Sequence, residues 1–269
     1  MKHSRTALYI LLIIYLLFGQ SSAQKKDPFE LTLTKEAILI TSGAAAGVTA
    51  LSILLNMDQL SIDKISTLNP LDVNKFDRVA IGIVQDDHLG DGLLFASYLM
   101  PFAFLANDDA RKDFGNLAIM YGEVLLINAS INGIIKGITK RIRPFTYHKE
   151  SPLDEKTTVN ARLSFYSGHV SITAANSFFT ASVLNEYLTN KTTKAIIWTA
   201  AFLYPAVVGF SRINTHWHFP TDVIVGYIVG AAIGYLIPLI HKSGNEININ
   251  SNNPAGYLHK PLIGFKVNL

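Results

Sequence analysis

The chain has 269 residues, enough for one large domain with a substantial core. Apolar residues make up 49% of it and charged residues only 16%, whereas an ordinary soluble domain has about a quarter charged residues. The net charge of +3 is too small to indicate a nucleic-acid binder, and the absence of cysteine excludes disulfides, thiolate metal sites and cysteine nucleophiles. The composition favours a membrane protein or a very apolar helical bundle.

Residues 1–23 have the pattern of an export signal. Lys2 and Arg5 form a basic start, residues 7–18 form a short apolar run, and the small residues at 21–23 are typical of a cleavage site. We predict a signal peptide here, with an uncleaved membrane anchor as the alternative. In both cases the protein enters or crosses a membrane, so a cytosolic location is not expected.

The rest of the chain predicts an all-α fold, a membrane-embedded bundle of about six apolar helices. Several of the apolar stretches are near the lower limit of about 17–20 residues for spanning a bilayer. We expect a helical-bundle domain over residues 24–242 and a polar C-terminal tail over 243–269. The helices are expected at residues 37–56, 92–106, 117–135, 169–186, 195–210 and 223–240.

Small residues recur at the spacing of helix-packing contacts. Gly43 and Gly47 form one pair, and Gly226, Gly230 and Gly234 form a series at intervals of four. A glycine every four residues presents a smooth helix face, so we predict close helix packing at both places. The two long polar connections differ in charge: residues 57–91 hold several acidic residues, whereas residues 136–168 are strongly basic.

Three polar clusters lie at the ends of apolar stretches. Taken alone, each cluster has a simple structural interpretation. The first would be cations at the membrane surface, the second a helix N-cap, and the third an acidic residue in the first turn of a helix. Together they have the composition of a phosphate site. The clusters are Lys136, Arg143 and Pro144; Ser167, Gly168 and His169; and Ser211, Arg212, His218 and Asp222.

The cations and the start of the helix at residue 169 suit the oxygens of a phosphate ester. Lys136, Arg143 and Arg212 can neutralise their negative charge, and arginine can do so with two parallel hydrogen bonds. Ser167 and Gly168 can add a hydroxyl, backbone N–H groups and the positive end of a helix dipole. We therefore predict that these five residues bind the substrate phosphate.

Two histidines are left for the chemistry. One must attack phosphorus and the other must protonate the departing alkoxide. Asp222 follows His218 by four residues, so its carboxylate can hold that imidazole in place, as the aspartate of a catalytic triad does. We predict that His218 and Asp222 form the nucleophile pair and that His169 is the general acid.

The order K-x6-RP, SGH and SR-x5-H-x3-D resembles the three-part signature of the type-2 phosphatidic acid phosphatase superfamily, which includes membrane lipid-phosphate phosphatases, soluble bacterial acid phosphatases and vanadium haloperoxidases. The resemblance covers residues 136–222. It implies an all-helical bundle, a phosphohistidine intermediate on His218, and no metal or cofactor requirement. One departure is Tyr166, where the family usually has proline before SGH; this position shapes the turn and could alter leaving-group selectivity.

The sequence itself gives no metal-ligand spacing of Asp, Glu and His residues. His216 and His218 are two residues apart and could share a metal on a loop, but a third ligand is not evident. We therefore expect neither a cofactor nor a metal in the reaction.

The leading hypothesis is a metal-independent phosphatase acting on a lipid phosphate or diphosphate. The alternatives are a soluble periplasmic acid phosphatase of broad specificity, a less favoured haloperoxidase, and a catalytically silent membrane binding protein. We expect a cell-envelope location with the site on the periplasmic or extracytoplasmic side. Counting spans opposes this if the signal is cleaved, since three crossings would then put Lys136 inside.

Overall fold

The computed structural model describes residues 27–243 and is all-α, as predicted. The predicted signal peptide at 1–23 and nearly all of the C-terminal tail lie outside the described residues, so these assignments stay predictions.

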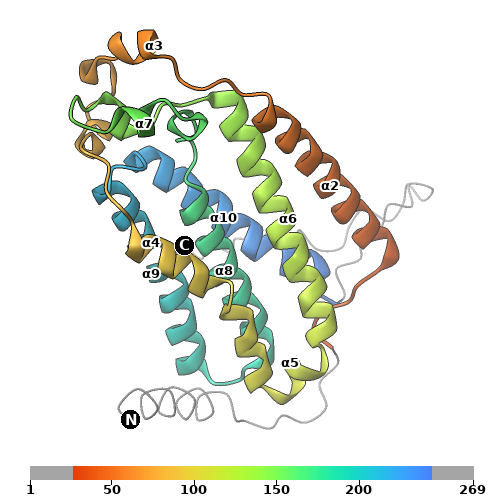
Figure 1. Ribbon diagram of the computed structural model, residues 1–269. Coiled ribbons are helices and arrows are strands. Elements are labelled where there is room, and N and C mark those ends of the chain that lie inside the picture. The colour runs from red at the N-terminus through yellow and green to blue at the C-terminus, as the bar shows by residue number, and fades with distance from the viewer. Residues whose placement is uncertain (1–26, 244–269) are drawn as a thin grey trace, which may run out of the picture.

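Six long helical segments form a bundle, and each corresponds to one of the predicted stretches (Figure 1). They are α2 (Leu33–Leu55), α4 (His88–Ser97) with the 3-10 helix η3 (Met100–Ala106), α6 (Phe114–Thr139), α8 (Gly168–Tyr187), α9 (Lys191–Asn214) and α10 (Pro220–His241). Short helices occupy the connections: α3 (Ile62–Ser66), η1 (Pro70–Asp72), η2 (Asp77–Ala80), α5 (Asp108–Lys112), η4 (Pro144–Tyr147), α7 (Leu153–Lys156) and η5 (Val159–Arg162).

The second segment is not the single helix that was predicted over 92–106. The α-helix ends at Ser97 and a 3-10 helix follows from Met100, with Pro101 in its first turn. Proline has no backbone N–H and clashes with the preceding helical turn, so an α-helix that reaches it is interrupted.

The outer surface of the bundle suits a membrane. Five segments of the described chain are long and apolar enough to cross one: Leu33–Leu55, His88–Ala106, Phe114–Tyr147, Lys191–Asn214 and Pro220–His241. Large apolar side chains on these segments point outward, which would be unfavourable in water. Examples are Leu33, Val48, Leu55, Phe95, Phe210 and Ile228.

Helix α8 differs because it is surrounded by protein. It packs against α10, α9, α6 and α4, and nearly all of its residues are buried. Its polar side chains bond to the neighbouring helices: Ser171 Oγ donates to Asn128 Oδ1 at 2.6 Å, and Asn176 Nδ2 donates to Ser97 Oγ at 2.9 Å. A polar helix is stable here because its hydroxyl and amide groups find partners inside the bundle.

The predicted close packing at the α10 glycines is confirmed. A Cβ added at Gly226 would lie 2.6 Å from Ser167 O, and one at Gly230 would lie 2.0 Å from Ser171 O. At Gly234 the corresponding distance to Ala175 O is 2.3 Å. The three glycines therefore let α10 lie directly against the backbone of α8.

The pair on α2 makes a looser contact. A Cβ at Gly43 would lie 3.0 Å from Leu126 Cδ2, and one at Gly47 would lie 3.1 Å from Ser130 Oγ, both on α6. The contact is tighter at a glycine of α6, where a Cβ at Gly137 would lie 2.3 Å from the Ile53 side-chain atom Cγ2. Close packing of α2 against α6 is thus also confirmed.

We expect Gly230→Ala to destabilise the protein by about 1–3 kcal/mol, because the new methyl group must push α10 away from α8. The control is Gly122→Ala, where an added Cβ meets nothing within 4 Å. That change should be neutral or stabilising, since alanine favours a helix by about 1 kcal/mol over glycine. The measurement is the free energy of unfolding in detergent, and equal effects of the two variants would contradict the packing argument.

Candidate active site

One cavity of 420 Å³ brings the three sequence clusters together at one end of the bundle. Its lining includes five of the predicted residues, which come from the end of α6, the connection after it, the start of α8, the end of α9 and the loop before α10. These residues are Lys136, Arg143, His169, Arg212 and His218. Three cations and two histidines thus face one space.

The end of α6 turns the chain so that Arg143 can enter the site. Lys140 adopts a left-handed conformation with φ 46° and terminates the helix. Arg143 is then held at 4% exposure. Its Nε and Nη2 donate to Asn160 O and Oδ1 at 2.8 and 2.9 Å, and its Nη1 donates to Trp217 O at 2.8 Å. Arg143 is therefore fixed before any ligand binds.

The His218 ring has one nitrogen toward the cavity and one toward Asp222. Nε2 lies 3.1 Å from Arg143 Nη1, and Nδ1 lies 3.6 Å from Asp222 Oδ2. Because arginine can only donate, Nε2 must accept, and the neutral ring carries its proton on Nδ1. Burial, followed by the neighbouring cations, lowers the pKa of His218 well below its ordinary value. A neutral imidazole is the form that a nucleophile requires, and its Nε2 lone pair accepts here from Arg143, which also lines the cavity.

Asp222 has two roles at once. It is fully buried, and its Oδ2 accepts from Phe219 N at 2.9 Å, which caps α10. The same oxygen accepts from Ser164 Oγ at 2.5 Å, and Oδ1 accepts from Arg141 Nη1 at 2.5 Å. The simple interpretation of Asp222 as a first-turn acid is therefore correct and compatible with its place beside His218.

Arg141 and Asp77 form a supporting pair that sequence reasoning missed. Arg141 Nη2 donates to Asp77 Oδ2 at 2.7 Å, so its guanidinium bridges the carboxylates of Asp77 and Asp222. Asp77 also accepts from Thr221 N at 2.9 Å. Burial raises the pKa of Asp77, but its hydrogen bonds outweigh burial and the net shift is downward. The pair ties η2 to the first turn of α10.

The acidic connection before α4 supplies further site residues that were not predicted. Arg212 Nη1 donates to Asp87 Oδ2 at 3.1 Å and to Asp91 Oδ1 at 3.3 Å. His169 Nε2 lies 2.9 Å from the same Asp91 oxygen, and Ser211 Oγ donates to Asp87 Oδ1 at 2.5 Å. The only sequence signal was the acidic composition of residues 57–91, which does not reveal a partner.

Ser167 and Gly168 lie beneath this site and are not among the residues that line the cavity. Ser167 N donates to Asp222 O at 3.0 Å, which joins the start of α8 to the start of α10. The Ser167 hydroxyl is buried and does not cap the helix, and it has no hydrogen-bond partner among the residues that the structure describes. Phosphate binding by these two residues stays a prediction.

His216 points away from the cavity. Its Nδ1 lies 2.9 Å from Ala80 O, and its ring occupies the space beside Gly82, where an added Cβ would lie 2.4 Å from His216 Cε1. A backbone φ of 65° at this residue directs the two histidines to different sides. A metal shared by His216 and His218 is therefore not supported by the geometry.

Three comparisons with known proteins show which proteins this chain is similar to. Residues 117–245 match the sequence model of the PAP2 superfamily. Phospholipid phosphatase 2 of Bos taurus is 29% identical over 154 residues, which are 47% of this chain and 54% of that protein. Phospholipid phosphatase 1 of Mus musculus is 32% identical over 89 residues, which are 32% of this chain and 31% of that protein. The chain spans about half, or less, of the length of the curated relatives that it matches.

A solved structure is also similar in part. The first transmembrane PAP2 type phosphatidylglycerolphosphate phosphatase from Bacillus subtilis has 20% sequence identity and a TM-score of 0.41, over 76% of this chain and 90% of that chain. The matched region 117–245 contains all three clusters, from Lys136 to Asp222. The resemblance that the clusters predicted is therefore confirmed.

We expect Arg141→Ala to destabilise the protein by about 3 kcal/mol, because it leaves the buried carboxylates of Asp77 and Asp222 without their shared cation. Arg141→Lys should have a smaller effect, since an ammonium keeps the charge but lacks the fork of a guanidinium.

The control is Arg111→Ala, which removes an exposed ion pair with Asp108 and should change stability by roughly 0–1 kcal/mol. The free energy of unfolding in detergent is measured for all three variants. If Arg141→Ala were no more destabilising than the control, the bridge would not support the site.

Proposed function

We propose that the chain is a phosphatase that hydrolyses a lipid phosphate or diphosphate through a phosphohistidine on His218. The observation that carries the proposal is the single cavity in which the neutral Nε2 of His218 faces the space between Lys136, Arg143 and Arg212, with His169 on its wall. The three cations can neutralise the negative charge of a bound phosphate. The two histidines can act as the nucleophile and the general acid of its hydrolysis.

The proposed reaction has two steps. In the first, His218 Nε2 attacks phosphorus, the ester P–O bond breaks, and His169 donates a proton to the departing oxygen. In the second, a water molecule attacks the phosphohistidine, His169 takes the proton from that water, and the P–N bond breaks to release inorganic phosphate. Asp222 faces the Nδ1–H of His218 and stabilises the positive charge that forms on the ring.

The nearby aspartates fit this scheme as positioning residues. Asp87 is buried and holds Arg212 and Ser211, so it keeps the guanidinium in place when phosphate is absent. Burial and the neighbouring Arg212 lower the pKa of His169 to about 4. Asp91, 2.9 Å from His169 Nε2, opposes this shift and favours the protonated form that the general acid requires.

A lipid substrate is supported by the surroundings of the cavity. Residues 27–243 include five candidate membrane spans with outward apolar side chains, and the cavity lies at the end of the bundle where α6 ends and α8 and α10 begin. The two mammalian relatives are named phospholipid phosphatases. The same surface argues against the soluble acid phosphatase that the sequence left open, because a water-soluble bundle would not present this apolar exterior.

We predict that His218→Ala lowers turnover by roughly 10³-fold or more, because no covalent intermediate can form. His169→Ala should lower turnover of an alkyl phosphate ester by roughly 10²–10⁴-fold and that of a nitrophenyl ester much less, since a good leaving group needs little protonation. Phosphate release is measured in detergent on a lipid phosphate, a small alkyl phosphate and the nitrophenyl ester.

His148→Ala is the matched control, because this histidine lies outside the cavity and accepts from Glu150 N. It should keep full activity. Full activity of His218→Ala would overturn the nucleophile assignment, and equal losses of His169→Ala on both kinds of ester would overturn the acid assignment. Preference for the small ester would favour the broad-specificity alternative, and no release from any ester would favour a silent binding protein.

The direction of α2 relates the cavity to the start of that helix. This helix starts at the end of the bundle opposite the cavity and ends near it, so residue 33 and the cavity lie on opposite sides (Figure 1). We propose that the cavity faces the periplasm or the cell exterior and that α2 starts at the inner face. This arrangement agrees with Lys191 and Lys194 at the start of α9, which shares the inner end.

The orientation can be tested directly because the chain has no cysteine. Lys64→Cys lies at the cavity end in α3, and Lys112→Cys lies at the opposite end in α5. In intact cells we expect a membrane-impermeant maleimide to label the Lys64→Cys variant only, and to label both variants after lysis. The reverse pattern in intact cells would place the cavity on the inner side.

A further inference from the structure

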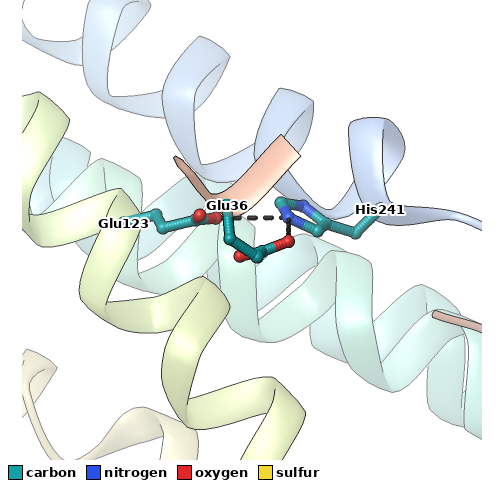
Figure 2. A group of neighbouring side chains, drawn as sticks. All are labelled: Glu36, Glu123 and His241. Atoms are coloured by element: carbon teal, nitrogen blue, oxygen red, sulfur yellow. Dashed lines mark hydrogen bonds and ion pairs between the residues drawn. The ribbon is translucent and has the colours of Figure 1, made fainter. Parts of the chain in front are cut away.

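A second buried ionisable cluster lies at the end of the bundle far from the cavity. Glu36 of α2, Glu123 of α6 and His241 of α10 point toward one another (Figure 2), and one ligand atom from each lies within 4.8 Å of the other two. Glu123 precedes Lys136 by 13 residues on α6, which is about 20 Å along the helix axis. The cluster is therefore separate from the proposed active site.

The orientation of His241 is fixed by the helix backbone. Its Nδ1 lies 2.8 Å from Ile237 O, and since a carbonyl only accepts, Nδ1 carries a proton. Nε2 is thereby directed at both carboxylates, 3.0 Å from Glu36 Oε1 and 3.4 Å from Glu123 Oε2. A histidine that donates one N–H to a carbonyl and turns its other nitrogen to carboxylate oxygens has the second-shell arrangement of a metal ligand.

The carboxylates lack the hydrogen bonds that burial demands. The Glu123 side chain is 1% exposed, and neither of its oxygens has a hydrogen-bond partner among the described residues; the same holds for Glu36 Oε2. The neighbouring Lys242 makes another contact, since its Nζ donates to Glu186 Oε1 at 2.9 Å. Buried carboxylates with so few hydrogen bonds are strongly unfavourable unless a proton or a cation compensates their charge.

Charge balance allows a divalent cation here. Two carboxylates, a neutral imidazole and a divalent cation sum to zero, and so do one carboxylate, one carboxylic acid and a protonated imidazole; the metal-binding experiment below separates the two arrangements. One nitrogen and two carboxylate oxygens without sulfur suit Zn²⁺ or Mn²⁺. We infer that Glu36, Glu123 and His241 bind a divalent transition-metal ion.

The ion would join three helices that are far apart in the sequence. It lies beside the place where the chain before α2 meets the end of α10, where Glu30 N donates to His241 O at 2.8 Å. Its role is structural, because none of its ligands lines the catalytic cavity. Sequence spacing gave no sign of the cluster, since its ligands are contributed by three separate helices.

The test uses full-length protein purified in detergent with an affinity tag that contains no histidine. After treatment with a chelator and its removal, Zn²⁺ or Mn²⁺ is added, and bound metal and the thermal unfolding midpoint are measured. We expect one ion per chain and a higher unfolding midpoint with metal. Glu123→Gln should lose both effects, because a carboxamide keeps the shape but not the charge.

Glu186→Gln is the matched control, since Glu186 lies at the same end and outside the cluster; it should bind metal as the wild type does. If Glu123→Gln cannot be purified, Glu36→Gln, whose side chain is partly exposed, serves in its place. The inference is overturned if wild-type protein binds no more Zn²⁺ or Mn²⁺ than these variants. Phosphate release by the metal-free protein is expected to persist, so failure of the metal site and failure of the proposed phosphatase are distinguishable.

Discussion

The close backbone contact between α8 and α10 is the constraint on which the site depends. Gly226 faces Ser167 O, so the contact extends to the first turn of α8, where Ser167 N donates to Asp222 O. Because a hydrogen atom is the largest group that fits at these glycines, the two helices pack backbone to backbone in the observed register. That register brings the second and third sequence clusters together, and places His169 and His218 on one cavity.

Concentrating three cations in one cavity is unfavourable unless anions compensate them. The protein divides this task between two aspartates. Asp87 is 4% exposed and bonded to Arg212 and Ser211, whereas the Asp91 side chain is 51% exposed. A carboxylate that stays in water is displaced at lower cost than a buried one. The buried Asp87 therefore holds the Arg212 guanidinium in place more firmly than the exposed Asp91 does.

The sequence predicted the helices and five of the eleven residues that line the cavity, because both depend on signals that are local in the chain. Hydropathy located the six segments, and fixed spacings identified Lys136, Arg143, His169, Arg212 and His218. What it missed depends on tertiary partners. An aspartate in an acidic loop does not reveal that it meets an arginine about 120 residues later, and Arg141 looked like one more cation in a basic run. Cluster residues on three helices, such as Glu123 and His241, share no spacing at all.

The distribution of polarity follows from the membrane. Lipid provides no hydrophobic drive between helices, so packing and hydrogen bonds must hold the bundle together. Helix α8 supplies these bonds from the centre, while the glycines of α10 allow the packing. The ionisable clusters then lie toward the two ends, separated by the part of the bundle in which glycines face carbonyls. His218 precedes the first turn of α10 and His241 ends that helix, so a change in charge at His241 lies a whole helix length away from His218.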